Sequence, residues 1–254
     1  MKDLNGKVSV IMPAYNEAAT IKESLEETVR TFDDFGCNYE VILLDDSSRD
    51  GTYDEALKVA RKYPQIKVKR IPRRYRSSGK GRALKKAFRY VTGDYIVFLD
   101  ADLDLHPIQV RTLFDIMLLS GADVVIGSKL HPNSKVEYPL SRKVISFIYY
   151  LITKILFGLP IHDSQTGLKV FKKEVLKHVF PRIVVKKFAL DLEILANVQR
   201  LGYKIAEAPV VLNQKRPMGR IGLKAMWQTG YDTLAIFYRM KILKYYDRFP
   251  HKVN

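Results

Sequence analysis

Three aspartates alternate with apolar residues near the middle of the chain. Asp100, Asp102 and Asp104 directly follow the apolar stretch 95–99, which reads as a buried strand. Carboxylates that alternate at a strand end can direct several oxygens at one hard cation, Mg²⁺ or Mn²⁺, which would keep water and diphosphate oxygens as further ligands. The competing interpretation is turn and helix-cap chemistry, because Asp104 lies just before a helix start at Pro107. The cluster predicts a metal site if other polar groups converge on it.

A second pair of carboxylates, Asp45 and Asp46, ends the apolar stretch 41–44. A carboxylate at this point can accept a hydrogen bond from a ribose hydroxyl or a base N–H. Ser48 and Asp50, which follow, fit a turn and a helix N-cap equally well. We expect both descriptions to hold, with one aspartate structural and its neighbour functional.

A short glycine-containing segment, Gly79-Lys80-Gly81, opens a predicted helix within a basic stretch. Free backbone N–H groups, the helix dipole and the Lys80 ammonium together favour phosphate at such a point. The segment is not a P-loop, because no glycine stands five residues before Gly79. The first strand leads into residues 13–17, which lack the glycine triplet of dinucleotide-binding folds. The P-loop NTPases and the dinucleotide-dependent dehydrogenases are thereby excluded.

Strands and helices alternate along the first half of the chain. Apolar stretches predict strands at 8–12, 41–44, 66–71, 95–99 and 123–126, and apolar residues at helical spacing predict helices at 17–35, 53–63 and 82–91. This order indicates an α/β fold with a mostly parallel central sheet and helices on both faces. Ligands of such sheets bind beyond the carboxyl ends of the strands. The polar residues at 13–15, 45–46 and 100–102 are therefore expected to meet at one edge.

The second half of the chain is less regular. We expect helices at 140–156, 189–200 and about 223–245, and strands at 167–171 and 203–212. The helix at about 140–158 is apolar nearly all round, so it either is buried or lies in a membrane interface. It is too short to span a bilayer, and Lys154 interrupts it. We expect one catalytic domain over residues 1–222, followed by a C-terminal helix and a basic, aromatic tail over residues 223–254.

The composition is strongly basic, with 43 Lys and Arg residues against 27 Asp and Glu and a net charge of +16. Residues 65–93 contain 11 basic residues and no acidic one. Such an excess indicates either an anionic partner or a solvated basic face. No nucleic-acid-binding motif accompanies it, so no nucleic-acid partner is expected. A single cysteine, Cys37, excludes an internal disulfide and a zinc-finger framework, and no signal peptide is visible.

The order of these motifs resembles the family 2 glycosyltransferases of the GT-A (Rossmann-like) fold. Segments 8–17, 44–51, 79–81 and 100–102 carry this resemblance. Segments 126–129, 163–171 and 191–193, together with Arg142, are similar to the polyprenyl-phosphate sugar synthases, such as dolichyl-phosphate mannose synthases and glucosyltransferases. The resemblance covers residues 7 to about 225. It implies a nucleotide-sugar donor, a divalent metal and a polyprenyl phosphate acceptor.

The resemblance also implies which residues hold the donor. The metal, Mg²⁺ or Mn²⁺, would be bound by Asp100 and Asp102, with Asp104 as a further ligand. Two basic residues of the family close over the donor, and they correspond to Lys215 and Arg220. Because the correspondence is loose by about one residue, Arg216 is an alternative for one of these positions. The residues expected to bind the nucleotide-sugar are Pro13, Tyr15, Glu17, Leu44, Asp46, Lys80, Asp100, Ala101, Asp102, Lys215 and Arg220.

On the acceptor side the resemblance implies that Lys129, Arg142 and Ser146 grip a phosphate. Lys129 stands where the family usually has an arginine, so the two-pronged contact of a guanidinium is lost. A lipid phosphate is largely ionised near pH 7 and needs cations to position it rather than a general base. Asp191 would serve as the base if the acceptor were a hydroxyl. The expected catalytic residues are therefore Asp102, Asp191, Lys129 and Arg142.

The expected reaction is a single in-line displacement that inverts the anomeric carbon of a hexose from UDP-glucose or GDP-mannose. Residues 165–169 and 191–193 are closer to the glucosyl than to the mannosyl relatives. A nucleotide-sugar binding module without catalysis is a further alternative. Basic and aromatic residues alternate over residues 238–249. Together with the apolar helix at about 140–158, this composition predicts peripheral attachment to an anionic membrane surface, on its cytoplasmic side.

Overall fold

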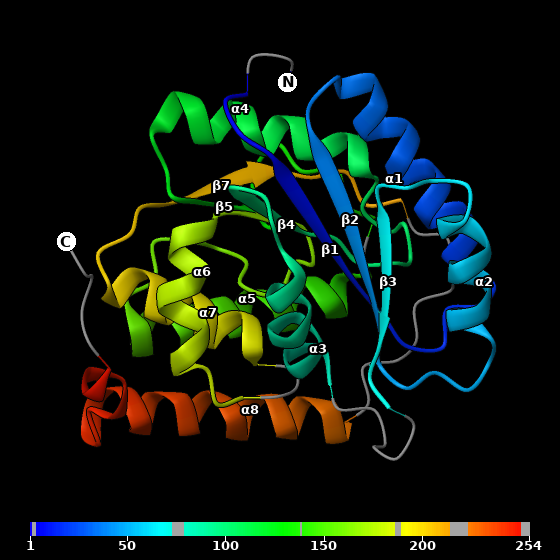
Figure 1. Ribbon diagram of the computed structural model, residues 1–254. Coiled ribbons are helices and arrows are strands. Elements are labelled where there is room, and N and C mark those ends of the chain that lie inside the picture. The colour runs from blue at the N-terminus through cyan, green and yellow to red at the C-terminus, as the bar shows by residue number, and fades with distance from the viewer. Residues whose placement is uncertain (2–3, 73–78, 138, 186–188, 214–222, 250–254) are drawn as a thin grey trace.

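The computed structural model describes residue 1 and residues 4–72, 79–137, 139–185, 189–213 and 223–249. Its centre is a seven-stranded sheet with the strand order β3-β2-β1-β4-β6-β5-β7 (Figure 1). Neighbouring strands are parallel, except that β6 runs antiparallel to both β4 and β5. The predicted mostly parallel sheet is therefore confirmed. The strands are β1 (Val8–Ala14), β2 (Tyr39–Asp45), β3 (Ile66–Arg70), β4 (Tyr95–Phe98), β5 (Val124–Ser128), β6 (Lys169–Lys172) and β7 (Ile205–Pro209).

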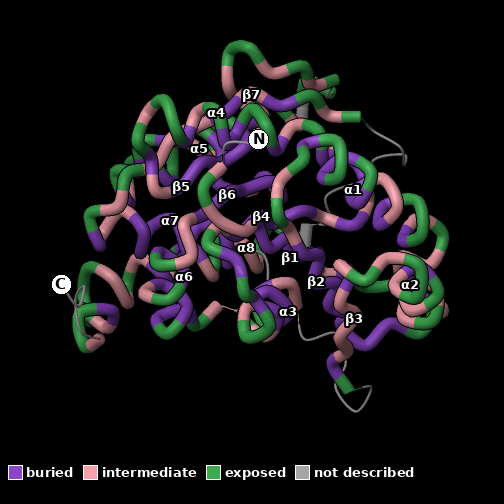
Figure 2. The backbone as a smooth tube through the Cα atoms, turned by 45° about the horizontal axis from the view of Figure 1, so that its top comes forward, coloured by how far each residue is buried: buried purple, intermediate pink, exposed green. Residues whose placement is uncertain are grey.

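Helices cover both faces of the sheet. Val10 and Met12 of β1 pack into the core on one face, whereas Ile11 packs into the core on the other. Successive side chains of a strand point to opposite faces, so a strand that is apolar at every position needs cover on both sides. Figure 2 shows the central strands buried and the exposed residues on the outer helices. One face carries α1 (Ile21–Phe35), α2 (Thr52–Ala60) and α4 (Val110–Ser120), and the other carries α3 (Lys80–Ala87), α5 (Leu140–Phe157), α6 (Lys173–Val179), α7 (Leu190–Arg200) and α8 (Leu223–Phe237).

Three elements differ from the sequence prediction. The helix α6 was not predicted, because its seven residues follow β6 directly and give less than two turns of helical periodicity. The last helix was predicted to run to about residue 245, but α8 ends at Phe237 and a π-helical segment, Tyr238–Ile242, follows. The strand predicted at 203–212 is limited to β7, which is the stretch that pairs with β5.

The helices α5 and α8 pack against each other and leave many apolar side chains exposed. Ile155 on α5 is 81% exposed and Trp227 on α8 is 80% exposed. The apolar helix at 140–158 is therefore not a core helix. In the described part of the chain, no helix is long and apolar enough to cross a membrane. The exposed apolar residues of the two helices are Leu140, Val144, Phe147, Ile148, Leu151, Ile152, Ile155, Met226, Trp227, Tyr231 and Leu234.

Candidate active site

The carboxyl ends of β1, β2 and β4 lie side by side at one edge of the sheet. Ala14 at the end of β1 pairs with Asp45 at the end of β2, and β4 pairs with β1 on its other side. A cavity of about 650 Å³ opens at this edge, within the usual range for small-molecule sites. We call it the main cavity. Its lining residues are Pro13, Ala14, Tyr15, Asp46, Gly79, Lys80, Ala83, Asp100, Gln165 and Asp191.

A residue with left-handed backbone follows each of these three strands. Asn16, Ser47 and Leu103 have φ angles of 55°, 68° and 59°. Such angles are uncommon outside glycine and persist where the surrounding structure holds them, often at functional sites. Leu103 is the strongest case, because its side chain has no polar group that could form a local hydrogen bond. Its turn allows the Asp104 N–H to donate to Asp102 Oδ1 at 3.1 Å, which brings the two carboxyl groups to the same side.

The adjacent aspartates at the end of β2 have different environments. Asp45 is fully buried and pairs with Arg70 at 2.9 Å. Asp46 lines the main cavity, and its Oδ2 accepts the Gly79 N–H at 3.0 Å. That contact holds the start of α3 at the cavity. The first aspartate therefore has a structural contact and the second lines the main cavity, while a role of Asp46 in binding a nucleoside stays a prediction.

The main cavity contains a close ion pair between Lys80 and Asp100, whose Nζ and Oδ1 atoms lie 2.6 Å apart. Burial acts to lower the pKa of Lys80, but the charges of Asp100 and Asp191 outweigh it and the pKa lies above its usual value. Burial acts to raise the pKa of Asp100, but the charge of Lys80 outweighs burial and the pKa lies below its usual value. Lys80 also stands at the N-terminus of α3, whose dipole favours anions. A diphosphate in this cavity would meet a fixed cation.

Asp100, Asp102 and Asp104 line a second cavity of about 150 Å³, the acidic cavity. Burial and then the charge of Asp100 raise the pKa of Asp102 to about 6, so negative charge is crowded here. Among the described residues, no three His, Cys, Asp or Glu side chains are gathered closely enough to hold a metal ion by themselves. Mg²⁺ is commonly held by only one or two carboxylates together with substrate phosphates. The donor set therefore fits a divalent cation that binds with a diphosphate.

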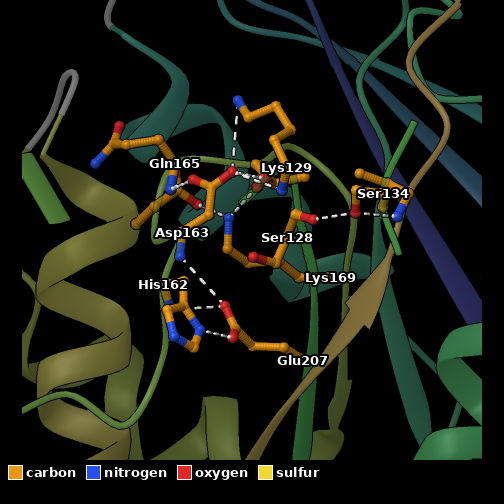
Figure 3. Close-up of polar contacts among 11 residues, drawn as sticks. Ser128, Lys129, Ser134, His162, Asp163, Gln165, Lys169 and Glu207 are labelled. Carbon is orange, nitrogen blue, oxygen red and sulfur yellow. Dashed lines mark hydrogen bonds and ion pairs between the residues drawn. The ribbon is translucent and has the colours of Figure 1, made fainter. Parts of the chain in front are cut away.

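Two cations, Lys129 and Arg142, line the acidic cavity beside the aspartates. Lys129 is held by Asp163: its backbone N–H donates to Asp163 Oδ2 at 3.0 Å, and its ammonium lies 3.8 Å from the same oxygen. Figure 3 shows Asp163 between Lys129 and the backbone N–H of Gln165. Burial acts to raise the pKa of Asp163, but the Lys129 charge and several hydrogen bonds lower it below its usual value. Asp163 thus stays ionised and keeps Lys129 in place.

A third cavity of about 330 Å³, the side cavity, lies against α5 and includes Ser146. Lys129 lines both the side cavity and the acidic cavity. Gln165 lines the main, acidic and side cavities. The three cavities therefore adjoin at Gln165.

A buried ion pair closes one wall of the main cavity. Lys169 on β6 is fully buried, and its ammonium lies 2.8 Å from Oδ1 of Asp191 in the first turn of α7. The ammonium also donates to the carbonyl oxygen of Thr166. Burial lowers the pKa of Lys169, and the charge of Asp191 opposes that change. The pair fixes the Asp191 carboxylate at the cavity wall.

Some residues expected at the donor site do not line the main cavity. The side chains of Leu44 and Ala101 are buried in the two hydrophobic cores on opposite faces of the sheet. Glu17 accepts a hydrogen bond from the Thr20 hydroxyl at 3.1 Å. Lys215, Arg216 and Arg220 lie outside the described residues.

Three residues of this site, Asp163, Gln165 and Lys169, were noted from the sequence only as part of the segment 163–171 and were given no individual role. The clearest signal was available for Lys169, which stands between Leu168 and Val170 in a predicted strand. A charged residue inside an apolar strand needs a partner, because an unpaired buried charge is costly. Asp163 and Gln165 lie on an irregular segment, where periodicity carries no information.

The comparison with protein-family models decides the family. The model described as glycosyl transferase family 2 matches residues 9–180, well over half of the chain. The chain belongs to glycosyltransferase family 2. The expectation drawn from the motifs is thereby confirmed, and the protein is a glycosyltransferase. The matched part of this family 2 enzyme contains the strand exits, the acidic cluster, Lys129 and Arg142.

Several relatives of the enzyme carry names that refer to dolichyl phosphate. It is 30% identical over 252 residues to a dolichyl-phosphate beta-glucosyltransferase of Trichomonas vaginalis, a match that covers 95% of this chain and 76% of that protein. It is 32% identical over 241 residues to the dolichol-phosphate mannosyltransferase of Pyrococcus furiosus, which covers 92% of this chain and 63% of that protein. Both glucosyl and mannosyl enzymes are thus among its relatives.

Solved structures support the fold. Glucosyl-3-phosphoglycerate synthase of Mycobacterium tuberculosis, in complex with Mn²⁺, UDP-glucose and phosphoglyceric acid, matches with a TM-score of 0.68 at 21% identity, covering 93% of this chain and 80% of that chain. Mannosyl-3-phosphoglycerate synthase of Rubrobacter xylanophilus matches with a TM-score of 0.71 at 17% identity, covering 98% and 77%. At these identities the matches support the α/β glycosyltransferase fold alone.

Proposed function

We propose that this family 2 glycosyltransferase transfers a hexose from a nucleotide-sugar, UDP-glucose or GDP-mannose, to the phosphate of a polyprenyl phosphate, with a divalent metal and with inversion at the anomeric carbon. The observation that carries the proposal is the shared acidic cavity, in which Lys129 and Arg142 stand beside Asp100, Asp102 and Asp104. The aspartates of that cavity suit a metal-bound diphosphate, and its two cations suit a second anion. The names of the Trichomonas and Pyrococcus relatives support a dolichyl-type phosphate as that anion.

The main cavity supports the donor half of the proposal. Pro13 and Tyr15 offer apolar surface in the main cavity. Asp46 offers a carboxylate that can accept a hydrogen bond from a ribose hydroxyl or from an N–H group of the nucleobase. Lys80 then offers a positive charge at a helix N-terminus for the diphosphate. The nucleoside, the diphosphate and the sugar would follow one another along this cavity. Lys215 and Arg220 remain predicted to close over the donor.

The acceptor half rests on Lys129, Arg142 and Ser146. Two cations and a hydroxyl suit the oxygens of a phosphate monoester, which presents several acceptors at once. Ser146 lines the side cavity, which lies against α5, and several apolar residues of α5 are exposed at the surface. A lipid phosphate could thus place its head between Lys129 and Arg142 and its chain along α5.

The chemistry is a displacement in which an acceptor phosphate oxygen forms a bond to the anomeric carbon as the bond to the diphosphate oxygen breaks. When bound at the aspartates, Mg²⁺ or Mn²⁺ would neutralise charge on the departing diphosphate. Lys80 stabilises the same charge, and Lys129 and Arg142 orient the attacking phosphate. An ionised phosphate carries no proton on the attacking oxygen, so the step needs no base.

A hydroxyl acceptor with Asp191 as base is the alternative. The pairing of Asp191 with Lys169 weighs against it, because a base must take up a proton, and protonated Asp191 would leave a buried ammonium without its counter-charge. A non-catalytic sugar-binding module is disfavoured by the family, and the Trichomonas and Pyrococcus relatives both carry the names of transferases.

The exposed apolar face of α5 and α8 supports peripheral attachment to an anionic membrane, proposed to be on its cytoplasmic side. Trp227 and Tyr231 stand on α8 beside the apolar residues of α5, a composition typical of the headgroup region. Arg239, Lys241 and Lys244 follow on the same end of the chain and would attract anionic lipid. A contiguous apolar surface of this kind is rare on a monomer that has no partner for it.

The proposal is tested by incubating the protein with radiolabelled UDP-glucose or GDP-mannose and a matched pair of acceptors, a polyprenyl phosphate and the corresponding polyprenol, with and without Mn²⁺. We expect transfer to the phosphate only, and loss of transfer without metal. Transfer to the polyprenol would favour the alternative with Asp191 as base. Full activity of Asp102→Asn would refute the metal assignment.

A further inference from the structure

Two further polar side chains, those of Asp191 and Gln165, line the main cavity. Asp191 lies close enough to Lys80 for its charge to act on that ammonium. Neither Asp191 nor Gln165 stands at a strand exit where the nucleoside is proposed to bind. Asp191 comes from the first turn of α7, and Gln165 from the segment before β6. A donor whose diphosphate lies at Lys80 would extend its hexose toward these two side chains.

We propose that Asp191 and Gln165 recognise the hydroxyl groups of the donor hexose, and that Lys169 is a positioning residue that holds Asp191 for this task. The inference rests on the proposed function, since it takes a nucleotide-sugar as the ligand of the main cavity. It gives Asp191 a role in sugar selection rather than in proton transfer.

The Asp191 carboxylate has one oxygen engaged and one available. Oδ1 accepts from Lys169 at 2.8 Å, and no side chain or backbone group of the described residues donates to Oδ2. An ionised carboxylate only accepts hydrogen bonds, so its natural partners in the cavity are hydroxyl groups of a sugar. Because Asp191 is buried, such a hydrogen bond forms away from water. A sugar whose hydroxyl points elsewhere cannot form this hydrogen bond and binds more weakly.

Lys169 limits what Asp191 can do. The ammonium is fully buried and has two acceptors, the Thr166 carbonyl and Asp191. If Asp191 lost its charge, Lys169 would keep a buried positive charge without a counter-ion, which is strongly unfavourable. The arrangement fixes the direction of the carboxylate and holds it against a buried positive charge, and both properties suit recognition rather than proton uptake.

Gln165 complements the carboxylate with a group that both donates and accepts. Its backbone N–H donates to Asp163 Oδ1 at 2.9 Å, which anchors it to the residue that holds Lys129. Its side chain lies 3.4 Å from the Tyr149 hydroxyl, a distance too long for a strong hydrogen bond, so the carboxamide can turn to a ligand at little cost. Since Gln165 lines all three cavities, it stands where the sugar would meet the acceptor.

The test measures binding rather than transfer, because binding needs no acceptor. Calorimetry with Mn²⁺ compares UDP-glucose, its epimer UDP-galactose, and UDP, with the GDP series used if the protein prefers guanine. For Asp191→Asn we expect the affinity for the preferred nucleotide-sugar to fall about 10- to 100-fold, as for one lost hydrogen bond to a charged group. The affinity for the nucleoside diphosphate without the sugar should stay unchanged. The preference between epimers should shrink together with the affinity for the nucleotide-sugar, and Gln165→Ala should shift the preference in the same direction.

Glu193→Gln is the matched control on the same helix. Glu193 is a fully buried carboxylate that accepts from the Val184 and Val185 N–H groups and from Tyr246, and it does not line the main cavity. We expect its replacement to lower the melting temperature without changing the preference between sugars.

For the positioning role, Lys169→Met should reproduce the loss of sugar preference, and Lys169→Arg should restore part of it. Melting curves identify variants that fail to fold; if Lys169→Met does not fold, Asp191→Asn decides.

The inference is overturned if Asp191→Asn keeps the affinity and epimer preference of the wild type while kcat falls, which is the behaviour of a base. It is also overturned if the wild type binds its nucleotide-sugar no better than the free diphosphate. Absence of transfer to polyprenyl phosphate would instead overturn the proposed function and leave these binding results standing.

Discussion

Gly167 lies so close to Asp100 that a Cβ atom at position 167 would come 1.9 Å from Asp100 Oδ2. The glycine precedes β6, and the aspartate follows β4, the strand that pairs with β6. The orientation of the first carboxylate in the acidic cluster therefore depends on the absence of a side chain on the neighbouring segment. Sequence proximity gives no hint of this relationship, because 66 other residues separate the two.

We expect Gly167→Ala to displace the Asp100 carboxylate and to lower kcat/KM by about 10- to 100-fold, since misplaced catalytic groups cost on this scale. The matched control is Gly230→Ala on α8, where an added Cβ meets nothing within 4 Å and helix propensity favours alanine. That variant should keep its activity and gain slightly in stability. Steady-state kinetics and melting curves for both variants provide the measurement. Wild-type activity in Gly167→Ala would show that the position of Asp100 is unimportant.

Lys129 and Arg142 are predicted to act on the acceptor and not on the donor. We expect Lys129→Gln and Arg142→Gln each to raise KM for polyprenyl phosphate by about tenfold or more, because a charge-assisted hydrogen bond contributes about 1.5–3 kcal/mol. Binding of the donor, measured by calorimetry, should change little. Lys177→Gln is the control, because Lys177 forms an exposed ion pair with Glu174 on α6, away from the cavities. A matching loss of donor affinity in the two variants would contradict the division of the site.

The exposed apolar face of α5 and α8 is predicted to hold the enzyme on lipid. Ile155→Glu and Trp227→Glu should each weaken binding to anionic phosphatidylserine vesicles by about tenfold, because burial of such a side chain contributes about 1.5–3 kcal/mol. Cosedimentation measures the effect. Leu119→Glu is the control, since Leu119 is 89% exposed but lies on α4, on the other face of the sheet. Equal losses in all three variants would mean that this face has no special affinity for lipid.

A buried carboxylate away from the cavities predicts how stability depends on pH. Glu40 on β2 accepts from Ser9 and Lys67 at 2.6 Å each and from the Thr92 N–H at 2.7 Å. Burial acts to raise its pKa, but these hydrogen bonds outweigh it and lower the pKa to about 2. Because the folded pKa lies below the unfolded value of 4.5, the carboxylate stabilises the fold above pH 4.5 and loses that contribution as the pH falls toward 2.

We therefore expect Glu40→Gln to lower the free energy of unfolding by about 2 kcal/mol at pH 7 and by clearly less at pH 3. Urea unfolding at the two pH values gives the comparison. Glu55→Gln removes an exposed carboxylate that pairs with Lys58, and it should change stability by less than about 0.5 kcal/mol at either pH. A Glu40→Gln effect that does not depend on pH would contradict the pKa assignment.

Much of this enzyme follows from local sequence patterns. The strands at 41–44 and 95–99 were found because each is an apolar run bounded by polar residues, and the strand at 66–71 because apolar and basic residues alternate at its start. Their alternation with amphipathic helices then required a mostly parallel sheet, and a parallel sheet gathers its strand ends at one edge. The sequence thereby determined the fold class, the family and the place where Asp46 and Asp100 meet.

Tertiary structure decided what depends on residues that are distant in the sequence. The Lys169–Asp191 pair joins β6 to α7, the Gly167–Asp100 contact joins segments on neighbouring strands, and the junction of three cavities at Gln165 depends on how α5 lies over the sheet. Periodicity reports only which face of its own element a residue occupies. Which side chain stands opposite is set by packing between elements, so the partner of Asp191 and the place of Gln165 among the cavities had to be taken from the folded chain.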